Sequence, residues 1–316
     1  MKGKRNIDLA KKAKKDCFYT QLSDIQNELD NYKEHFKDKV ICCPCDETAH
    51  TKFYEHFCGN IETYKWKKLI CVGYDTKHPT KAIIVENVNG EPVATYKDLV
   101  GDGDFRNKET IELMEQSDII VTNPPFSLFR EFMALLTSLD KKYIILGNQN
   151  AISYQEIFPL FRDNKMWAGY SFNKVFEFKV EDGYSYNRID EKGNKYGRVP
   201  GICWFTNLDI EKREVFLDTN IDFEFGSRKF NYKKYDNYDA LNVDKVKQIP
   251  MDYEGIMGVP ITFLDKYNPK QYRIIGLLAG GNNKDIIGIE KTWDKSEARG
   301  VVDGKLVYAR LLIQKI

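Results

Sequence analysis

The sequence of 316 residues lacks the features of a membrane-bound or secreted protein. No apolar run approaches the roughly 20 residues that a membrane-spanning helix needs. The basic N-terminus is not followed by the apolar stretch of a secretory signal. The seven cysteines are odd in number and have no disulfide-like spacing, which favours reduced thiols. Together these absences predict a cytoplasmic protein.

An excess of charge of one sign is also missing, because 48 Lys and Arg balance 47 Asp and Glu and leave a net charge of +1. The overall charge neither favours nor excludes a nucleic-acid partner, so an enzyme acting on nucleic acid must concentrate positive charge locally. Residues 1–15 are such a region, and their charged members are Lys2, Lys4, Arg5, Asp8, Lys11, Lys12, Lys14 and Lys15. Two interpretations of this basic arm stay open, a solvated disordered segment and a segment that contacts DNA.

The sequence has no standard zinc-binding pattern. Cys43, Cys45, His50, His56 and Cys58 lie near one another, but their spacing fits no common Cys/His zinc motif. The chain has only four histidines, and none has the sequence context of a Ser-His-Asp triad. We therefore expect ordinary thiols, structural histidines and no metal.

The first half of the chain alternates short apolar runs with helical patterns. Strands are predicted at 40–43, 69–72, 118–122 and 143–146, and helices at 22–36, through Phe53 and Phe57, at 108–116 and at 127–139. Residues 76–100 are expected to be irregular, with an Asn89-Gly90 turn of the kind that closes a hairpin. This alternation predicts an α/β fold with a mostly parallel sheet and helices on both faces.

Four segments with loop-like composition follow predicted strands or strand-like runs. They are residues 44–46, 73–75, 101–105 and 123–126. Ligands of open parallel sheets bind at the carboxyl ends of the strands. We therefore expect these segments to meet at one rim of the sheet and to form a site there.

The most informative of them is Asn123-Pro124-Pro125-Phe126. The exocyclic amine of adenine is a poor nucleophile, because its lone pair is delocalised into the ring. Two fixed acceptors, the Asn123 side-chain carbonyl and the Pro124 backbone carbonyl, would orient this amine towards an incoming methyl group. Phe126 offers a flat face for an extruded base. The alternative is a rigid turn with Phe126 buried, but the strand before the motif and the helix after it favour catalysis.

With this motif in place, the sequence resembles the EcoRI-type adenine-specific DNA methyltransferases of restriction–modification systems. The similarity extends over nearly the whole chain, and its stretches include Phe18–Gln21, Gly101–Arg106, Ser117–Glu131, Thr206–Asp209, Lys234–Ala240 and Met257–Leu264. The resemblance implies a Rossmann-like methyltransferase domain that moves a methyl group from S-adenosylmethionine to the N6 amine of a flipped-out adenine in duplex DNA. It implies no metal and a monomer, and any cognate restriction endonuclease is expected to act separately; the sequence leaves open whether one exists.

The resemblance also implies which residues hold the methionine end of the cofactor. Tyr19 and Thr20 look like the segment that closes over it. Pro44, Cys45 and Asp46 occupy the place of the usual cofactor loop. That loop normally carries a Phe-x-Gly-x-Gly pattern, whereas this stretch has no glycine.

The adenosyl end of the cofactor is assigned in the same way. Asp104 looks like the residue that hydrogen-bonds the cofactor's adenine, and Phe105 like the residue that packs against it. Asp75 is similar to the acidic residue that binds the ribose hydroxyls. For Asp75 an ordinary turn residue is an equally good interpretation.

Later residues are candidates for DNA contact. Phe172 and Phe176 would help to hold the flipped base, although burial in the core is the simpler interpretation of each ring. Lys233 and Lys234 lie in a segment rich in basic and aromatic residues, which suits phosphate contact. The tyrosines of this segment are Tyr232, Tyr235 and Tyr238, and each of them is better explained as cover for a sheet edge.

The composition changes along the chain indicate three parts: a basic arm at 1–15, a catalytic domain at 16–210 and a DNA target-recognition region at 211–316. Strands are expected near 175–178 and 202–205, whereas 223–255 shows no clear periodicity. Two other functions use the same motif, methylation of RNA adenine or of a protein glutamine amide. A DNA-binding module without turnover is a third alternative, which the intact Asn123 motif disfavours.

Overall fold

The computed structural model describes residues 22–46, 51–75, 80–180, 186–279 and 299–316. Two compact units make up the chain. Unit 1 consists of residues 1–149 and 168–208, and unit 2 of residues 150–167 and 209–316. Segment 150–167, expected in the catalytic part, is therefore grouped with the C-terminal residues. No helix in the described residues is long and apolar enough to cross a membrane.

Unit 1 is built on a central sheet with the strand order β4-β3-β2-β1-β5-β6-β11-β7. Its middle strands, β2, β1, β5 and β6, pair in parallel. The bounds are β1 Val40–Asp46, β2 Lys68–Gly73, β3 Lys81–Val88, β4 Glu91–Asp98, β5 Ile119–Thr122, β6 Lys142–Asn148, β7 Trp167–Ala168 and β11 Ile202–Thr206. This parallel core within a mostly parallel sheet confirms the predicted α/β, Rossmann-like fold.

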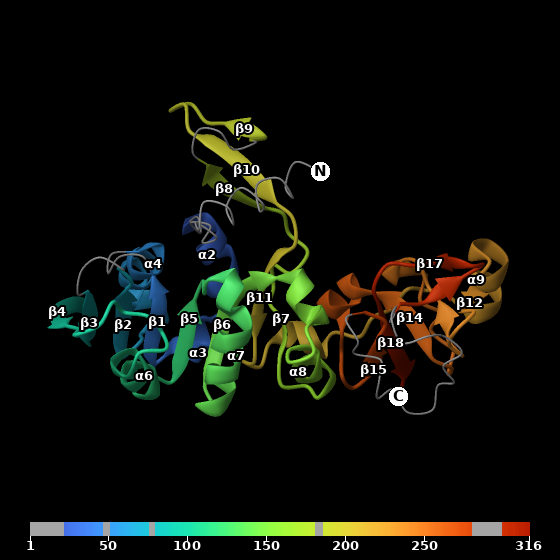
Figure 1. Ribbon diagram of the computed structural model, residues 1–316, viewed down its shortest axis with the longest axis horizontal. Coiled ribbons are helices and arrows are strands. Elements are labelled where there is room, and N and C mark those ends of the chain that lie inside the picture. Colours follow the sequence, from blue (N-terminus) through green and yellow to red (C-terminus); the bar gives the residue numbers. More distant parts are fainter. Residues whose placement is uncertain (1–21, 47–50, 76–79, 181–185, 280–298) are drawn as a thin grey trace. The chain divides into compact units, whose positions relative to one another are not determined.

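Helices cover both faces of this sheet. They are α2 (Leu22–Leu29), α3 (Lys33–Phe36), α4 (Lys52–Gly59), α5 (Ile61–Tyr64), α6 (Lys108–Glu115) and α7 (Phe129–Ser138), with 3₁₀ turns η1 (Asp30–Tyr32) and η2 (Phe126–Leu128). The α4 crossover leads from β1 to β2, and the α7 crossover leads in the opposite direction along the sheet, from β5 to β6. Because such crossovers keep one hand, the two helices lie on opposite faces. Figure 1 shows α7 in front of the strands.

One expectation for unit 1 was wrong. Residues 81–98 form the antiparallel hairpin β3–β4 and are not irregular. The predicted turn is confirmed, because Asn89 and Gly90 both have positive φ, 55° and 91°. Every residue of the edge strand β4 is exposed, so its sequence lacks the alternation of a half-buried strand.

A small antiparallel sheet is inserted between β7 and β11. It has the order β8-β10-β9, with bounds Phe176–Val180, Lys195–Val199 and Arg188–Ile189. The chain then enters β11, whose first residue Ile202 pairs with Asn148 at the carboxyl end of β6. The insertion is therefore rooted at the edge of the sheet where the parallel strands end, and Figure 1 shows it projecting there.

Unit 2 has a mixed sheet of the order β12-β13-β14-β18-β15. The bounds are β12 Lys233–Lys234, β13 Leu241–Asn242, β14 Met257–Pro260, β15 Tyr272–Leu277 and β18 Arg310–Lys315, with a separate pair β16 Val301–Val302 and β17 Lys305–Leu306. Its helices are α8 (Phe158–Arg162) and α9 (Phe223–Phe230). Helix α9 lies in a segment where no element was expected, and the side chain of Asp222 caps it by accepting from Phe225 N–H at 2.7 Å.

Candidate active site

The Asn123 motif lies directly beyond the carboxyl end of β5. All residues of β5 are buried between β1 and β6, so the sheet fixes the point where the motif begins. Pro125 adopts φ −56° and ψ 124°, and its carbonyl accepts a hydrogen bond from Leu128 N–H at 2.9 Å. Half-buried Phe126 starts η2, which leads into α7. The turn uses the Pro125 carbonyl, and the Pro124 carbonyl stays the predicted backbone acceptor beside Asn123.

The loop that precedes α6 lies against the end of β2. Asp75 N–H donates to the Asp102 carbonyl at 2.9 Å. Gly103 has a φ of +80°, and a Cβ atom there would lie 2.0 Å from the carbonyl oxygen of Gly73. Only glycine fits so close to another backbone with a positive φ. Two of the predicted site segments, 73–75 and 101–105, are therefore brought together as expected.

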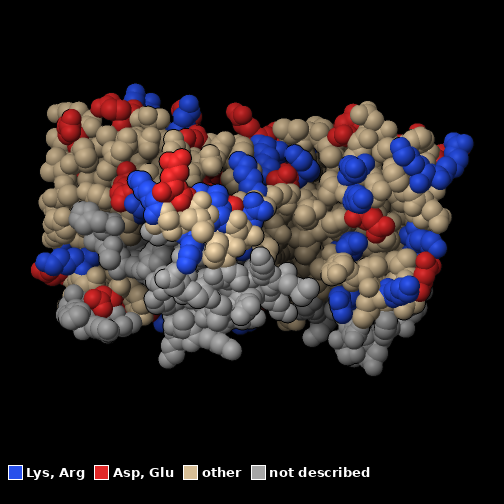
Figure 2. Space-filling model, turned by 90° about the horizontal axis from the view of Figure 1, so that it is seen from above, with Lys and Arg blue, Asp and Glu red and all other residues tan. Residues whose placement is uncertain are grey.

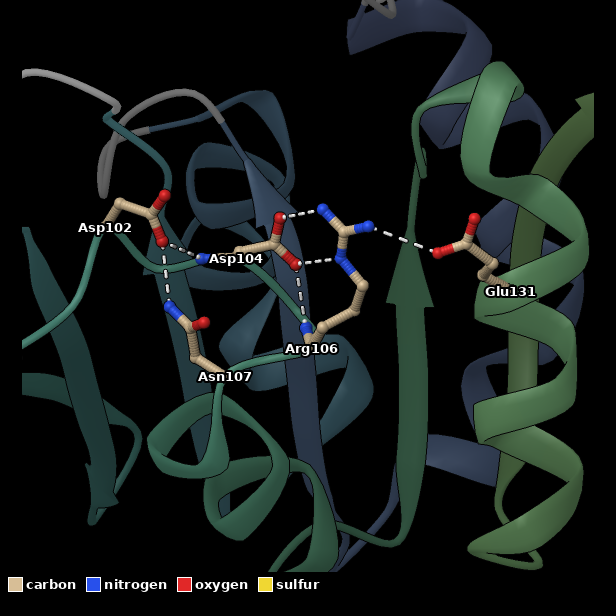
Figure 3. Close-up of polar contacts among 5 residues, drawn as sticks. All are labelled: Asp102, Asp104, Arg106, Asn107 and Glu131. Carbon is tan, nitrogen blue, oxygen red and sulfur yellow. Dashed lines mark hydrogen bonds and ion pairs between the residues drawn. The ribbon is translucent and has the colours of Figure 1, made fainter.

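Asp102 holds this loop in one conformation. Its Oδ1 accepts hydrogen bonds from Asp104 N–H at 3.1 Å and from Asn107 Nδ2 at 2.8 Å. Asn107 N–H in turn donates to the Asp104 carbonyl at 2.9 Å. The loop is thus preorganised by its own side chains, as Figure 3 shows for Asp102 and Asn107.

Asp104 is engaged by Arg106 (Figure 3). Its Oδ1 accepts from Arg106 Nε at 2.9 Å and from Arg106 N–H at 2.9 Å, and its Oδ2 accepts from Nη2 at 2.7 Å. These hydrogen bonds hold the pKa of Asp104 below its ordinary value. The carboxylate is therefore ionised at neutral pH and acts as a hydrogen-bond acceptor.

Phe105 points into the protein. Its side chain is buried, and its ring meets that of Phe132 on α7 edge to face, with 5.1 Å between the centroids. The Arg106 guanidinium carbon lies 5.6 Å from the centroid of the same ring. Phe105 therefore anchors the loop on the helix that follows the Asn123 motif.

The glycine-free segment at 44–46 belongs to β1 and is not a loop after it. The register with β2 shifts between Cys43 and Asp46, which pair with Cys71 and Gly73. Proline lacks a backbone N–H and is tolerated at such bulges, which accounts for buried Pro44. Cys45 is half-buried. Tyr19 and Thr20 lie outside the described residues, as does the basic arm at 1–15.

The predicted base-holding rings Phe172 and Phe176 are both buried. The Phe172 ring lies 6.4 Å from that of Phe205 on β11, and its carbonyl accepts from Gln149 Nε2 at 2.9 Å. This arrangement matches the core interpretation, and contact with a target base stays a prediction for both rings.

The predicted phosphate contacts Lys233 and Lys234 are exposed and both have acidic partners. Lys233 Nζ lies 3.0 Å from Asp303, and Lys234 Nζ lies 2.8 Å from Asp239. Lys233 also borders a pocket of about 280 Å³ in unit 2. Tyr235 and Tyr238 are buried in the core of this unit, so their burial accounts for them without DNA. On the face shown in Figure 2, groups of Lys and Arg alternate with Asp and Glu over the described residues.

His56, one of the two histidines near residue 50, has structural surroundings. His56 is buried, its Nε2 lies 2.7 Å from the Tyr64 hydroxyl oxygen, and burial lowers its pKa to about 4. His50 lies outside the described residues. Within the described ranges, no three His, Cys, Asp or Glu side chains are grouped as metal ligands.

Arg106 and Glu131 are two polar residues of this rim to which the sequence assigned no role. Arg106 Nη1 lies 3.2 Å from Glu131 Oε2 on α7, so it joins the loop of Asp104 to the helix after the Asn123 motif. The spacing of two residues between Asp104 and Arg106 was a usable signal. The partnership with Glu131, which is 25 residues away, was not visible in the sequence.

The chain is similar to known proteins over nearly its whole length. Residues 6–316 match the family model described as adenine-specific methyltransferase EcoRI. The chain is 40% identical to the type II methyltransferase M.EcoRI of Escherichia coli, over 96% of this chain and 94% of that protein. It is 38% identical to M.MgeORF184P of Mycoplasma genitalium, over 98% of both chains, and 38% identical to M.MpnI of Mycoplasma pneumoniae, over 85% of both. No solved structure matches.

The match over nearly the whole chain, together with the Asn123 motif at the end of β5, shows that this chain belongs to the EcoRI family of adenine-specific methyltransferases.

Proposed function

We propose that this chain is a site-specific DNA adenine-N6 methyltransferase and the modification enzyme of a type II restriction–modification system. The observation that carries the proposal is the Asn123 motif, which follows the central strand β5 in a chain of this family. Its relatives are named type II methyltransferases, which favours duplex DNA as the substrate. Reduced thiols favour the cytoplasm as the place of the reaction.

The motif performs two tasks on the target amine. The Asn123 side-chain carbonyl and the Pro124 backbone carbonyl accept hydrogen bonds from the two N–H groups of the amine, which turns the nitrogen lone pair towards the methyl donor. Pro124 and Pro125 have fixed φ angles, so the acceptors need little reorganisation during the reaction. The adenine must leave the duplex to reach them, and Phe126 then stacks on the extruded base.

S-adenosylmethionine, when bound, supplies an electrophilic methyl group on a sulfonium and needs no metal for this chemistry. The residues of the rim fit such a molecule. The Asp104 carboxylate is ionised and only 13% exposed, which suits hydrogen bonding to an adenine amine. Asp75 lies one hydrogen bond from the same loop and suits the ribose hydroxyls. Tyr19, Thr20, Pro44, Cys45 and Asp46 are assigned to the methionine end by family resemblance.

DNA recognition is assigned to the later part of the chain. Catalytic residues precede about residue 210, and residues 211–316 form the proposed target-recognition region. Lys233 and Lys234 supply phosphate contacts there by exchanging their carboxylate partners for phosphate. We propose that the enzyme acts as a monomer and that any cognate endonuclease acts separately.

The test is to map modified bases in a methylation-deficient bacterial host that expresses the chain. Wild type should place N6-methyladenine at one short sequence throughout the genome. Asn123→Ala should lower the rate of methylation by about 100- to 1,000-fold, because one preorganised acceptor is lost. Its circular dichroism and its affinity for S-adenosylhomocysteine should match wild type.

The same preparations distinguish the alternative substrates. If purified RNA or protein glutamine were methylated and DNA were not, the substrate would be RNA or protein and not DNA. Near-normal turnover by folded Asn123→Ala would contradict the assignment of the motif.

A further inference from the structure

The side chain of Arg106 joins two parts of the rim. Three of its hydrogen bonds, from Nε, Nη2 and its backbone N–H, go to the carboxylate of Asp104 at 2.7–2.9 Å. The remaining terminal nitrogen, Nη1, lies 3.2 Å from Glu131 Oε2 on α7. Figure 3 shows the guanidinium extended between the two carboxylates.

The ion pair between Arg106 and Glu131 contributes little to folding. Arg106 is 51% exposed and Glu131 is 56% exposed, and ion pairs between exposed side chains are weak because water screens them. The geometry around Arg106 is nevertheless specific, since the planar guanidinium grips Asp104 with two parallel hydrogen bonds. Such a grip fixes the plane of the Asp104 carboxylate.

The hydrogen bonds are distributed unequally over the two oxygens of Asp104. Among the described residues, Oδ1 accepts two hydrogen bonds and Oδ2 accepts one. A carboxylate oxygen has room for about two hydrogen bonds. Oδ2 is therefore the oxygen with capacity for a further donor.

Resting on the proposed function, we propose that Arg106 is a positioning residue for recognition of the cofactor's adenine. It fixes the carboxylate of Asp104 so that Oδ2 accepts a hydrogen bond from the adenine amine. Glu131 holds the outer side of the guanidinium and ties this arrangement to α7. Arg106 itself touches no reacting atom, so its loss should reduce discrimination at the purine and leave the fold intact.

The experiment compares two ligands by calorimetry, S-adenosylhomocysteine and S-inosylhomocysteine, which has a carbonyl oxygen in place of the adenine amine. Wild type should prefer the adenosyl ligand by about 10- to 100-fold, because the inosyl ligand offers Asp104 no amine. Arg106→Ala should reduce this preference to about threefold or less. Arg106→Lys should be intermediate, since an ammonium lacks the planar fork. Glu131→Gln should reduce the preference only partly.

Arg162→Ala is the matched control, because Arg162 makes an exposed ion pair with Asp163 at 2.8 Å in unit 2. It should keep the wild-type preference. The ratio of two affinities cancels a general loss of folded protein, and Arg106→Lys and Glu131→Gln provide the answer if Arg106→Ala does not fold.

The outcomes separate this proposal from the one on which it rests. If wild type showed no preference for the adenosyl ligand, the assignment of Asp104 to the cofactor site would be wrong. A wild type with the preference and an Arg106→Ala variant that keeps it in full would overturn the role of Arg106. Arg106→Ala that loses only DNA affinity would also overturn it and would make Arg106 a phosphate contact.

Discussion

At the scale of single residues, Phe126 allows a test of base extrusion. Its half-buried ring follows the two prolines at the start of η2. DNA with 2-aminopurine at the target position should become more fluorescent on binding wild type, because the base leaves the stack. Phe126→Ala should lower the methylation rate by about tenfold and DNA affinity by much less, since stacking on an aromatic ring contributes about 1–3 kcal/mol per base.

Tyr96→Ala is the control for this substitution, because Tyr96 is an exposed aromatic residue on the edge strand β4. It should change neither fluorescence nor methylation. A Phe126→Ala protein that is defective only in DNA affinity would assign the ring to simple packing.

Asp24 on α2 gives a residue-scale prediction about pH. Burial, and secondly the charge of Glu177, raise the pKa of Asp24 from 3.8 to about 6. A carboxyl group whose folded-state pKa is raised stabilises the fold below about pH 4, and this contribution is lost as the pH rises through about 6. At pH 8 the folded protein therefore carries an unfavourable charge, which Asp24→Asn removes.

Chemical denaturation at two pH values measures this effect. Asp24→Asn should increase the free energy of unfolding by about 1–2 kcal/mol at pH 8 and should change it little at pH 4. Asp163→Asn is the control with the opposite sign, because hydrogen bonds from Arg162 lower the pKa of Asp163. A gain for Asp24→Asn that is equal at both pH values would rule out titration of this group as the cause.

At the scale of elements, the contact between the 101–105 loop and the end of β2 depends on Gly103. A Cβ atom at this position would meet the Gly73 carbonyl oxygen at 2.0 Å and Thr80 Cγ2 at 2.6 Å. Gly193, which has a φ of +79°, has nothing within 4 Å of the same point. Gly193→Ala should therefore cost only the positive φ, about 1–2 kcal/mol of unfolding free energy.

Gly103→Ala adds a steric clash to the same backbone strain and should cost about 1–3 kcal/mol more. It should also weaken binding of S-adenosylhomocysteine by at least about tenfold, whereas Gly193→Ala should not, because Gly103 belongs to the loop that carries Asp104 and Gly193 does not. Calorimetry and denaturation of the two variants provide the comparison. If the two variants bound S-adenosylhomocysteine equally well, the 101–105 loop would not be part of the cofactor site.

At the scale of the whole molecule, the proposed division of labour predicts a selective defect. Replacing Lys233 and Lys234 together with Ala should weaken DNA binding by roughly tenfold and flatten the logarithmic salt dependence by about 2, since each phosphate contact contributes about 0.9. Affinity for S-adenosylhomocysteine should not change. Binding isotherms at several salt concentrations measure the slope.

The control replaces Lys52 and Lys81, which are exposed lysines of unit 1 with acidic partners of their own. This pair should leave the salt dependence unchanged. If the salt dependence of DNA binding were unchanged in the Lys233 and Lys234 variant, the phosphate contacts would lie elsewhere. The basic arm at 1–15 would then be the next candidate.

Local patterns determined most of the parallel core. The strands β1, β2, β5 and β6 were predicted because buried strands are continuous apolar runs, and α6 and α7 because helical spacing follows each loop. The carboxyl ends of such strands must share one edge, and segments 73–75 and 101–105 were expected to meet there. Segment 101–105 reaches this edge through the hairpin β3–β4, which was not predicted. Family resemblance and the Asn123 motif provided the chemistry.

Tertiary structure alone decided the contacts between residues far apart in the chain. The ion pair between Arg106 and Glu131, the approach of Gly103 to Gly73 and the burial of Phe105 against Phe132 depend on how crossovers place loops beside helices. The exposed strand β4 was hidden because none of its residues is buried. Helix α9 was hidden because it is only eight residues long and fully buries only Gly226. A sequence pattern records which face of an element is buried, whereas the partner that buries it is set only when the elements pack.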